Sequence, residues 1–386
     1  MLARSSPLTY QRNYRNVIIL SFTSFILVFS LFTWLFLLPI YLKELGAEDV
    51  HIGVSYSIFG LGYTVAQFLG GYLSDYFGRK YLIVIPTWLF SALYLLMALS
   101  NNWIYVAIFY LLISIGSAFQ SPSFTSIIAE SVEEDKVGMG FGAFELSIMI
   151  GIALGPLAGS AFLEIFNVRE LIIGSAIASL VTAIIRQLGL IEPVRRQRRE
   201  LTKFVLERDQ MWFIIAGSLM LLCLSFTING PFMTLYQEEI LGLNESEINL
   251  LFGMAGIPSA ILCLAAGWLA DRLGGKRITA ASIVIHAAST FLWVYFGGSF
   301  LFLVLSFIFV QFFYVSYQTL ISKITTEENR ARFVGLFGTV SGLVSSIGPY
   351  VGMYVKLHSG YLATFQLCLF ISIISSLLLS KLVSQS

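Results

Sequence analysis

The sequence predicts an all-α integral membrane protein, with twelve transmembrane helices arranged as two pseudo-symmetric bundles of six. Three observations support this fold class. Hydrophobic residues make up 57% of the 386 residues and charged residues only 12%, about half the charged share of a soluble domain. Apolar stretches long enough to cross a hydrocarbon core of roughly 30 Å recur along the whole chain. Residues of the first half also recur at a fixed offset in the second half.

Twelve apolar stretches are each long enough to form a membrane-spanning helix, which needs about 20 residues. Continuous stretches of this length exclude a membrane barrel, whose strands need only about 9–11 residues. Backbone groups in lipid must bond within the protein, so helices remain. The first stretch is too long for a cleavable signal peptide and has no small-residue cleavage site. The predicted spans are residues 17–42, 52–74, 81–100, 103–129, 137–163, 168–190, 211–237, 248–270, 278–297, 299–322, 332–356 and 360–383.

Basic residues predict the orientation of these spans, because Lys and Arg concentrate in cytoplasmic loops. With the N-terminus inside, twenty of the 23 Lys and Arg residues fall on the cytoplasmic side. Only Lys43, Arg169 and Lys356 fall outside, and Arg186 is counted with the basic segment between the halves. We therefore expect a multi-pass protein of the cytoplasmic membrane with both termini in the cytoplasm.

Composition excludes several classes of protein. A formal net charge of +1 is too small for a nucleic-acid binder or an acidic disordered chain, so the expected partners are the lipid bilayer and a small molecule. No Walker A, GxSxG, HExxH or dinucleotide-binding pattern occurs, which excludes an ATP-driven pump and predicts no cofactor. Neither a disulfide nor a metal site is expected, because the cysteines lie in apolar runs without neighbouring histidines. They are Cys223, Cys263 and Cys368.

The second half of the chain repeats the first. Seven residues recur as the same residue type 196 positions later, namely Gly46, Gly60, Gly71, Leu73, Asp75, Gly78 and Lys80. Further matches at an offset of 193 are Gly142, Gly155 and Pro156 with Gly335, Gly348 and Pro349. Because six spans per half is an even number, both halves have the same orientation in the membrane. The predicted organisation is a bundle over residues 1–190, a basic linker over 191–210 and a bundle over 211–386.

The loop after the second span carries the longest repeated pattern. It includes Gly71, Asp75, Gly78, Arg79 and Lys80, and its copy after the eighth span includes Gly267, Asp271, Gly274, Lys276 and Arg277. Glycine permits a tight turn, and a carboxylate at Asp75 is placed to face a helix N-terminus, which favours an anion. Acidic partners within reach of Arg79 or Lys80 are Glu130, Glu133 and Glu134. We expect a cytoplasmic gate here; the alternative is a basic loop with incidental carboxylates.

The fifth span carries a stripe of glycines. Gly151, Gly155 and Gly159 are spaced i, i+4, i+8, so they lie on one side of a helix, and such stripes let membrane helices touch backbone to backbone. Pro156 would bend this helix by removing a backbone donor. The stripe predicts a tight contact between the two halves or, equally well, ordinary helix packing.

Glu145 is the only carboxylate well inside a predicted span. It lies nine residues beyond Lys136, about 13 Å along a helix with a rise of 1.5 Å per residue. Ionisable residues at such depth usually face a cavity and take part in substrate or proton movement, and we expect this role for Glu145. The alternative is a protonated structural carboxyl hydrogen-bonded between helices. His286, in the ninth span, is expected to be structural.

Further candidates for contact with substrate or protons lie in spans one, four, seven and ten. They are Trp34, Tyr110, Gln120, Asn229, Gln311, Tyr314 and Gln318. The last three share one helix face, because they are spaced i, i+3, i+7. Asn229 precedes Gly230-Pro231, which predicts a break whose free carbonyls need a cavity or a partner. Each of these side chains could equally hold neighbouring helices together.

The chain resembles the major facilitator superfamily along essentially its whole length. Residues Gly71 to Lys80 match the family's loop pattern G-x-L-[A/S]-D-x-x-G-R-[K/R], and the second copy matches it with Gly275 in place of a basic residue. The fifth-span glycines with Pro156 are similar to the G-x3-G-P-x2-G-G motif of antiporters in this family. The resemblance implies alternating access around a path lined by spans one, four, seven and ten. Tyr110 departs from the family, since many proton-coupled members have Arg there.

The resemblance implies a secondary transporter, and not an enzyme, that moves a small organic solute. The glycine motif and Glu145 favour proton-coupled export of a drug-like compound or metabolite, acting as an antiporter and as a monomer. The alternative is a sugar or organic-anion importer of the same fold, a symporter or uniporter; against an anion, no buried Arg or Lys is expected mid-span. A polytopic membrane enzyme would need clustered His, Asp or Cys at one membrane face, and a channel would not need the repeated loop motifs.

Overall fold

The structure of the protein is a computed structural model that describes residues 14–133, 136–192, 206–326 and 329–382. All regular elements in these ranges are helices, which confirms the predicted fold class. Most of the predicted linker, residues 193–205, lies outside the described residues together with Arg195, Arg196, Arg198 and Arg199, and so does Glu134.

The first half runs from α1 to α7. Several of its helices begin at residues that satisfy otherwise free backbone N–H groups. The Asn102 side chain caps α5, and Asn167 and Glu170 form a capping box at the start of α7. The elements are α1 (Arg15–Phe32), the 3₁₀-helix η1 (Leu35–Leu37), α2 (Leu38–Glu44), α3 (Asp49–Phe77), α4 (Arg79–Leu99), α5 (Trp103–Ser131), α6 (Val137–Leu163) and α7 (Val168–Gly189).

The second half runs from α8 to α14. Asn244 caps α10 together with Glu247. Gly78 and Gly274, a repeat pair, separate α3 from α4 and α10 from α11 with φ of 96° and 94°, a region that favours glycine. The elements are α8 (Arg208–Ser225), α9 (Phe232–Glu239), α10 (Glu245–Leu273), α11 (Gly275–Tyr295), α12 (Phe300–Ile324), α13 (Arg330–Ser346) and α14 (Gly348–Leu379).

These helices lie at the twelve predicted spans. Within the described residues, ten helical segments are long and apolar enough to cross a membrane, the last of them the 48-residue segment Arg332–Leu379. That segment folds back at Gly360 (φ 80°, ψ 176°) and therefore crosses twice. The pair α8 and α9 makes the remaining crossing; α8 begins with three polar residues, Arg208, Asp209 and Gln210, and a break separates it from α9.

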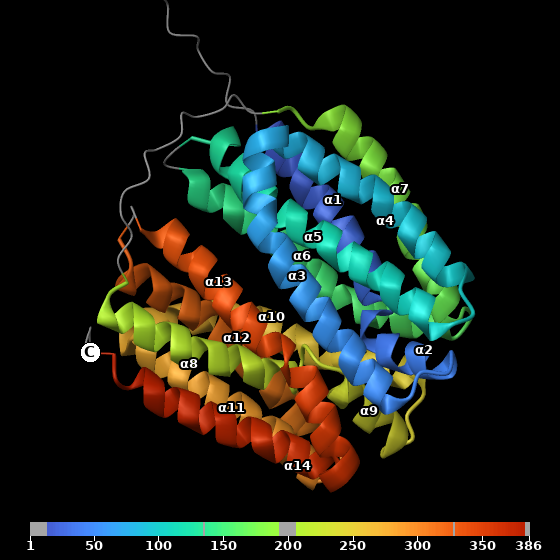
Figure 1. Ribbon diagram of the computed structural model, residues 1–386, viewed down its shortest axis with the longest axis vertical. Coiled ribbons are helices and arrows are strands. Elements are labelled where there is room, and N and C mark those ends of the chain that lie inside the picture. Colours follow the sequence, from blue (N-terminus) through green and yellow to red (C-terminus); the bar gives the residue numbers. More distant parts are fainter. Residues whose placement is uncertain (1–13, 134–135, 193–205, 327–328, 383–386) are drawn as a thin grey trace, which may run out of the picture.

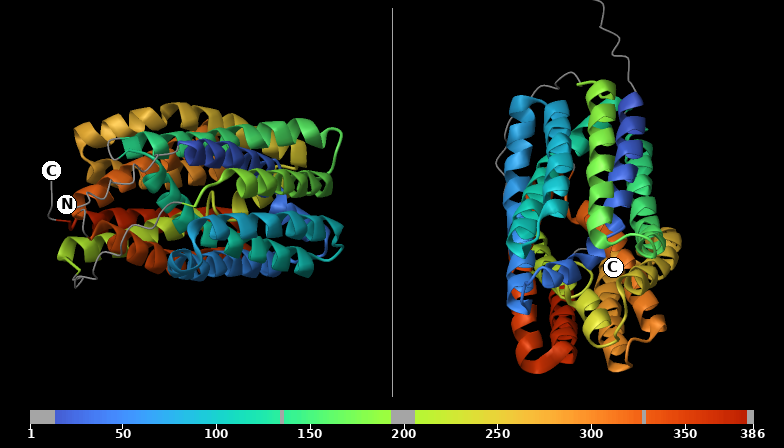
Figure 2. Two further views of the ribbon diagram at one scale, coloured as in Figure 1. Left: turned by 90° about the horizontal axis from the view of Figure 1, so that it is seen from above. Right: turned by 90° about the vertical axis from the view of Figure 1, so that its right-hand side faces the viewer.

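The two halves have the same internal packing. In the first half α1 packs on α6, α3 on α5 and α4 on α7; in the second, α8 packs on α13, α10 on α12 and α11 on α14. Between the halves, α6 packs on α10, and α3 packs on α13 and α14. Figures 1 and 2 show two bundles that approach each other near α2 and α9. The repeat in the sequence is therefore a repeat in the fold.

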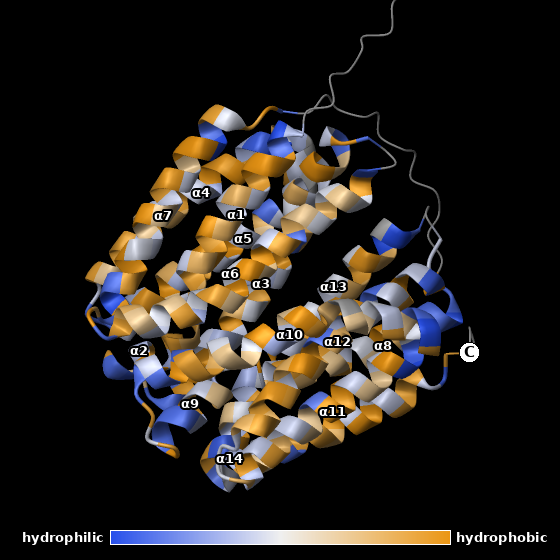
Figure 3. Cartoon of the chain, turned by 180° about the vertical axis from the view of Figure 1, so that it is seen from behind, coloured by the Kyte–Doolittle hydropathy of each residue, from blue (hydrophilic) through white to orange (hydrophobic). Residues whose placement is uncertain are grey.

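We name the two ends of the bundle for orientation. The linker end is where α3 and α7 end and α8 begins, and the far end is where α2 and α9 end and α14 folds back. Figure 3 shows apolar residues along the middle of the helices and polar residues gathered toward the ends. This is the pattern expected of helices whose middle sections lie in hydrocarbon.

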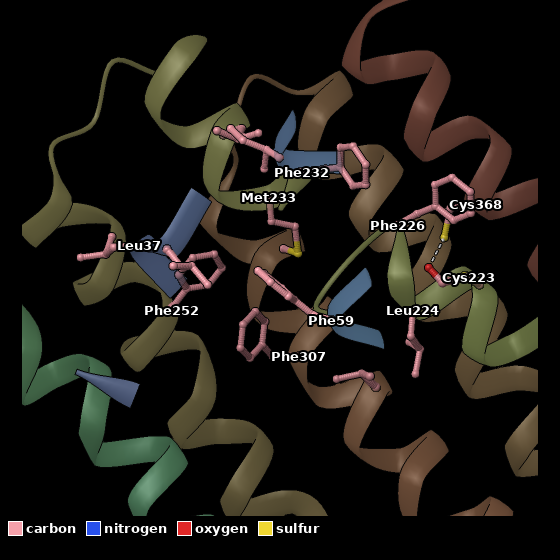
Figure 4. Packing of buried hydrophobic residues seen from close by; sticks show 14 of the residues in the cluster. Leu37, Phe59, Cys223, Leu224, Phe226, Phe232, Met233, Phe252, Phe307 and Cys368 are labelled. Atoms are coloured by element: carbon pink, nitrogen blue, oxygen red, sulfur yellow. Dashed lines mark hydrogen bonds between the residues drawn. The ribbon is translucent and has the colours of Figure 1, made fainter. Parts of the chain in front are cut away.

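A buried hydrophobic cluster joins the halves in the far-end part of the molecule. Phe36 of η1 stacks on Phe252 of α10, with ring centroids 4.4 Å apart. Figure 4 shows Leu37 and Phe59 of the first half near Phe252 and Phe307 of the second. The halves are thus held by a shared core on this side.

Candidate functional site

Three candidate residues lie where α8 is interrupted. Asn229 is in the break between Ser225 and Phe232, and its Nδ2 donates to the hydroxyl of Tyr314 on α12 (3.4 Å). Gln311, one turn earlier on α12, donates from Nε2 to the sulfur of Met149 on α6 (3.8 Å). The polar face of α12 therefore contacts the break on one side and the first half on the other. Gln318, farther along this face, is exposed.

The break is supported from behind by a buried histidine. His286 of α11 is fully buried, and its Nε2 lies 2.8 Å from the hydroxyl of Thr227, two residues before Asn229. Its Nδ1 lies 2.9 Å from the carbonyl oxygen of Ser306. The backbone N–H of Asn229 donates to the carbonyl of Leu224 (3.0 Å), so backbone bonds also hold the break. These contacts give His286 the structural role expected from the sequence.

Glu145 faces the boundary between the halves. It lies eight residues after the start of α6, about 12 Å along the helix, and its side chain is exposed. The opposite side of α6 is apolar and exposed at Leu154, which lies two and a half turns after Glu145. Met149, four residues after Glu145 and on the same side, contacts Gln311 of the second half. Glu145 thus lies one turn closer to the linker end than the polar contact at Gln311.

Two of the first-half candidates lie inside their own bundle, so the expectation that they line a path between the halves is wrong. Trp34 is fully buried, and its Nε1 donates to the hydroxyl of Ser175 on α7 (2.8 Å). Gln120 is buried, and its Nε2 donates to the carbonyl of Ile83 (2.7 Å) and the hydroxyl of Thr87 (2.9 Å), both on α4. Helical spacing shows which residues share a face but not which neighbour that face meets.

Tyr110 takes an intermediate position. It is half-buried, with its ring 4.8 Å from the ring of Phe59 and 6.3 Å from that of Trp34. It belongs to an aromatic cluster of the first half that also includes Tyr94, packed edge-on against Trp34. Tyr110 thus packs with aromatic side chains of its own half.

The first half contains a buried cation that was not expected from the sequence. Arg186 is 1% exposed, and it does not lie in the linker, where the charge count placed it. It donates to the hydroxyls of Thr23 (2.9 Å), Ser24 (3.0 Å) and Thr87 (3.0 Å) and lies 5.2 Å from the ring centre of Phe124. Arg186 lies in the last turn of α7, so its burial does not contradict the expectation that no Arg or Lys is buried mid-span. The signal for its burial was its position inside the predicted span 168–190.

The glycine stripe of α6 packs mainly within its own half. A Cβ on Gly151 would lie 3.0 Å from the backbone N of Phe29, and one on Gly155 would lie 2.6 Å from Cβ of Phe32, both on α1. Only Gly159 also meets the second half, at the side-chain amide of Asn249 (2.7 Å). Of the two interpretations of the stripe, helix packing therefore holds at the first two glycines. Pro156 is buried inside α6.

The loop after α3 is tied to the end of α7. Glu192 accepts hydrogen bonds from the backbone N–H groups of Arg79 (2.8 Å) and Lys80 (2.7 Å), at the start of α4. The carboxylate of Glu192 thus binds a helix N-terminus, which is the role that the sequence suggested for Asp75. The side chain of Asp75 and the surroundings of Gly71 lie outside the described part of the structure. Arg79 forms an ion pair with Glu130, one of its expected partners. This ion pair lies within the first half.

The matching loop of the second half uses different chemistry. Lys276 Nζ donates to the carbonyls of Ser380 (2.9 Å) and Leu382 (2.6 Å), just after α14. Asp271 and Arg277 are not fully buried, and a Cβ on Gly267 would make only an ordinary contact, 3.8 Å from Val315. Both halves therefore tie the start of their third span to the end of their sixth, with a carboxylate in one and a lysine in the other.

Hydrogen bonds between the halves extend from the far end to the middle of the helices. Thr234 donates to the carbonyl of Phe36 (2.8 Å), and Asn249 to the carbonyl of Thr33 (2.7 Å). Ser246 donates to the carbonyl of Ser160 (2.9 Å). Ion pairs at the far end add to these bonds. The structure thus holds the two halves together on the side opposite the linker.

Fold and site together define a multi-pass helical membrane transporter built from two like halves around a polar boundary. The profile of the Major Facilitator Superfamily matches residues 20–222 and 215–385, and the chain belongs to this superfamily. The chain is 24% identical to an uncharacterized MFS-type transporter, MJ1317, of Methanocaldococcus jannaschii, over 95% of this chain and 94% of that protein.

Two further similarities extend the comparison. Multidrug resistance protein MdtG of Escherichia fergusonii is 27% identical over 264 residues, which cover 64% of each protein. The crystal structure of the nucleoside transporter NupG superposes with a TM-score of 0.76 at 17% identity, over 96% of this chain and 99% of that one. At this identity the structural likeness concerns the fold. The similar proteins are transporters and not enzymes.

Proposed function

We propose that the chain exports a small amphipathic organic compound from the cytoplasm, as a monomer in the cell membrane, in exchange for protons. The observation that carries this proposal is the position of Glu145. It is an exposed carboxylate on the boundary face of α6, one turn from the contact between Met149 and Gln311. A carboxylate at this depth can exchange its proton for a substrate as access alternates.

The substrate class follows from the residues around Glu145. The polar groups described at the boundary are the amides of Gln311 and Asn229 and the hydroxyl of Tyr314, and the sulfur of Met149, one turn from Glu145, accepts from Gln311. Arg186 is buried against hydroxyls inside the first half and does not offer its charge at this boundary. Neutral hydrogen-bonding groups, aromatic rings and one carboxylate suit an apolar compound with a polar or cationic group.

The direction of transport is supported by charge and by similarity. The excess of Lys and Arg at the linker end favours a cytoplasmic position for that end. Because the halves are joined at the far end, we infer that the structure represents a state in which the end away from the cytoplasm is closed. One similar protein is named a multidrug resistance protein, which supports export. We infer that the linker end takes up substrate and the far end releases it.

The test is transport by purified protein in liposomes. Glu145→Gln, which mimics the protonated carboxyl, should abolish substrate accumulation driven by a pH gradient and leave counterflow exchange at wild-type rates. Glu145→Asp should retain part of the driven transport. Glu164→Gln is the matched control, because Glu164 is an exposed carboxylate at the other end of the same helix. Accumulation driven by pH alone in Glu145→Gln would show that the proton takes another route.

A further inference from the structure

Six side chains form an ion cluster at the far end, and Glu239 at the end of α9 is its centre. Glu239 Oε1 lies 2.7 Å from Lys43 Nζ on α2 and 2.9 Å from Lys356 Nζ on α14. Its other oxygen, Oε2, accepts a hydrogen bond from the hydroxyl of Tyr361 (2.7 Å). The far-end ion cluster also includes Asp49, 2.6 Å from Lys356, and Glu238, 3.6 Å from Lys43.

The ion pairs of this cluster cross between the halves in both directions. Lys43 of the first half pairs with Glu239 of the second, and Lys356 of the second half pairs with Asp49 of the first. The cluster is partly buried: the Lys356 side chain is 6% exposed and that of Glu239 is 22% exposed. Partly buried pairs are less screened than surface pairs. Separation of the halves at this end would break all three crossing pairs at once, because Lys43 also pairs with Glu238 of the second half.

The repeat explains why Lys43 meets Glu239. The two positions are 196 residues apart, the offset of the repeat, so they occupy the same place in the two halves. Residues at matched places can meet only at the pseudo-twofold axis, as in a symmetric dimer. Two identical charges there would repel each other. This chain has a lysine in one half and a glutamate in the other, so the contact on the axis becomes an attraction.

The surrounding carboxylates make the cluster sensitive to the loss of a lysine. Glu44 of the first half interacts with Glu238 and Glu245 of the second. Without the two lysines, acidic residues of one half would face acidic residues of the other. Burial raises the pKa of Glu239, but hydrogen bonds from Lys43, Tyr361 and Lys356 outweigh this effect and hold its pKa below the usual value. Glu239 therefore stays charged near neutral pH.

We propose that the far-end ion cluster is the latch that closes the far end, and that its crossing pairs at Glu239 and Asp49 must break before that end opens. The latch rests on alternating access, which the proposed function also uses, but not on the substrate, the proton or Glu145. It lies at the opposite end of the molecule from the repeated loop motifs. Opening and closing of the far end then depend on charged residues that differ between matched positions of the two halves.

The experiment measures distances across both ends by spin labels in liposomes. One pair of labels replaces exposed Val50 and Ile240, on opposite halves at the far end; the other replaces exposed Phe77 and Leu273 at the linker end. Cys223, Cys263 and Cys368 are first changed to alanine. Lys43→Glu and Lys356→Gln should each raise the population with an open far end about tenfold. This factor lies between those expected for the loss of an exposed ion pair and of a buried ion pair. The linker-end distance should shorten correspondingly.

Two controls keep the test decisive. Lys43→Arg keeps the charge and should keep the wild-type distances, and Lys136→Gln removes an exposed lysine that pairs with Glu133 within the first half and should change neither distance. Lys43 is 36% exposed, so Lys43→Glu remains informative if Lys356→Gln does not fold. Wild-type distances in Lys43→Glu would overturn the latch and would leave the proton-coupling test of Glu145 unaffected.

Discussion

The two halves use the same place in the repeat for different purposes. Each has an interrupted inner helix: α1 gives way to η1 after Phe32, and α8 gives way to α9 after Ser225. The offset of 196 pairs Trp34 with Gly230. In the first half Trp34 is fully buried and fills the interruption against Tyr94. In the second half Gly230 has no side chain with which to fill the matching position, and the neighbouring Asn229 is exposed.

This difference shows that a symmetric fold need not contain a symmetric site. The first half uses its interruption for packing, and its polar residues Gln120 and Arg186 bond to groups of their own bundle. The second half presents amides and a hydroxyl at the boundary. The first half contributes Glu145. If the comparison is right, mutations at matched places should affect stability in one half and transport in the other.

The largest expected effect concerns the matched glycines Gly155 and Gly348. Gly155→Ala should cost about 1–3 kcal/mol of stability, the usual range for overpacking, because the new Cβ would lie 3.0 Å from the backbone oxygen of Phe29. Gly348→Ala should cost a comparable amount, because its Cβ would lie 2.9 Å from Cβ of Ser225, a contact that rotation of the Ser225 hydroxyl does not relieve. Thermal unfolding in detergent measures both variants. A loss of stability at Gly348 well below that at Gly155 would mean that the contact in the second half yields more easily.

A smaller effect separates packing from transport at the interrupted helices. Trp34→Phe loses the hydrogen bond to Ser175, which contributes about 0.5–1.5 kcal/mol, and leaves a small cavity at a fully buried position. It should lower stability without changing the KM for transport. Tyr314→Phe loses a bond at the boundary and should change stability by less than about 0.5 kcal/mol. Its KM should rise about two- to tenfold, the factor for one neutral hydrogen bond. The opposite result, with KM altered only in Trp34→Phe, would place the site in the first half.

The smallest effect is expected where Glu192 binds the start of α4. Glu192→Gln removes a charge at a helix N-terminus, which contributes about 0.3–1 kcal/mol at exposed sites. Hydrogen exchange at the amides of Arg79 and Lys80 should become several times faster, as such a loss predicts. The first turn of α11, where Lys276 makes the matching connection, is the internal control. Unchanged exchange at α4 would show that Glu192 does not stabilise this helix start.

The sequence by itself determined the fold class and the repeat. The length and hydrophobicity of the apolar stretches suffice to predict the spans, because lipid offers the backbone no hydrogen-bond partners and so requires helices. The fixed offset revealed the two halves, and Asn229-Gly230-Pro231 revealed the break after α8. Glycines at Gly78 and Gly274 marked two tight turns, since a positive φ selects that residue. Each of these features depends on local chemistry, which a single stretch of sequence contains.

Tertiary structure decided which of the polar residues face the boundary. The period of a helix places Gln120 and Tyr110 on or near one face, but it does not say which neighbour that face meets. Trp34 and Arg186 are buried because Ser175, Thr23 and Thr87 come to them from helices more than 90 positions away. The crossing pair of Lys43 and Glu239 likewise joins residues 196 positions apart. Such contacts exist only once the helices have packed, because their energy comes from groups that the local sequence does not contain.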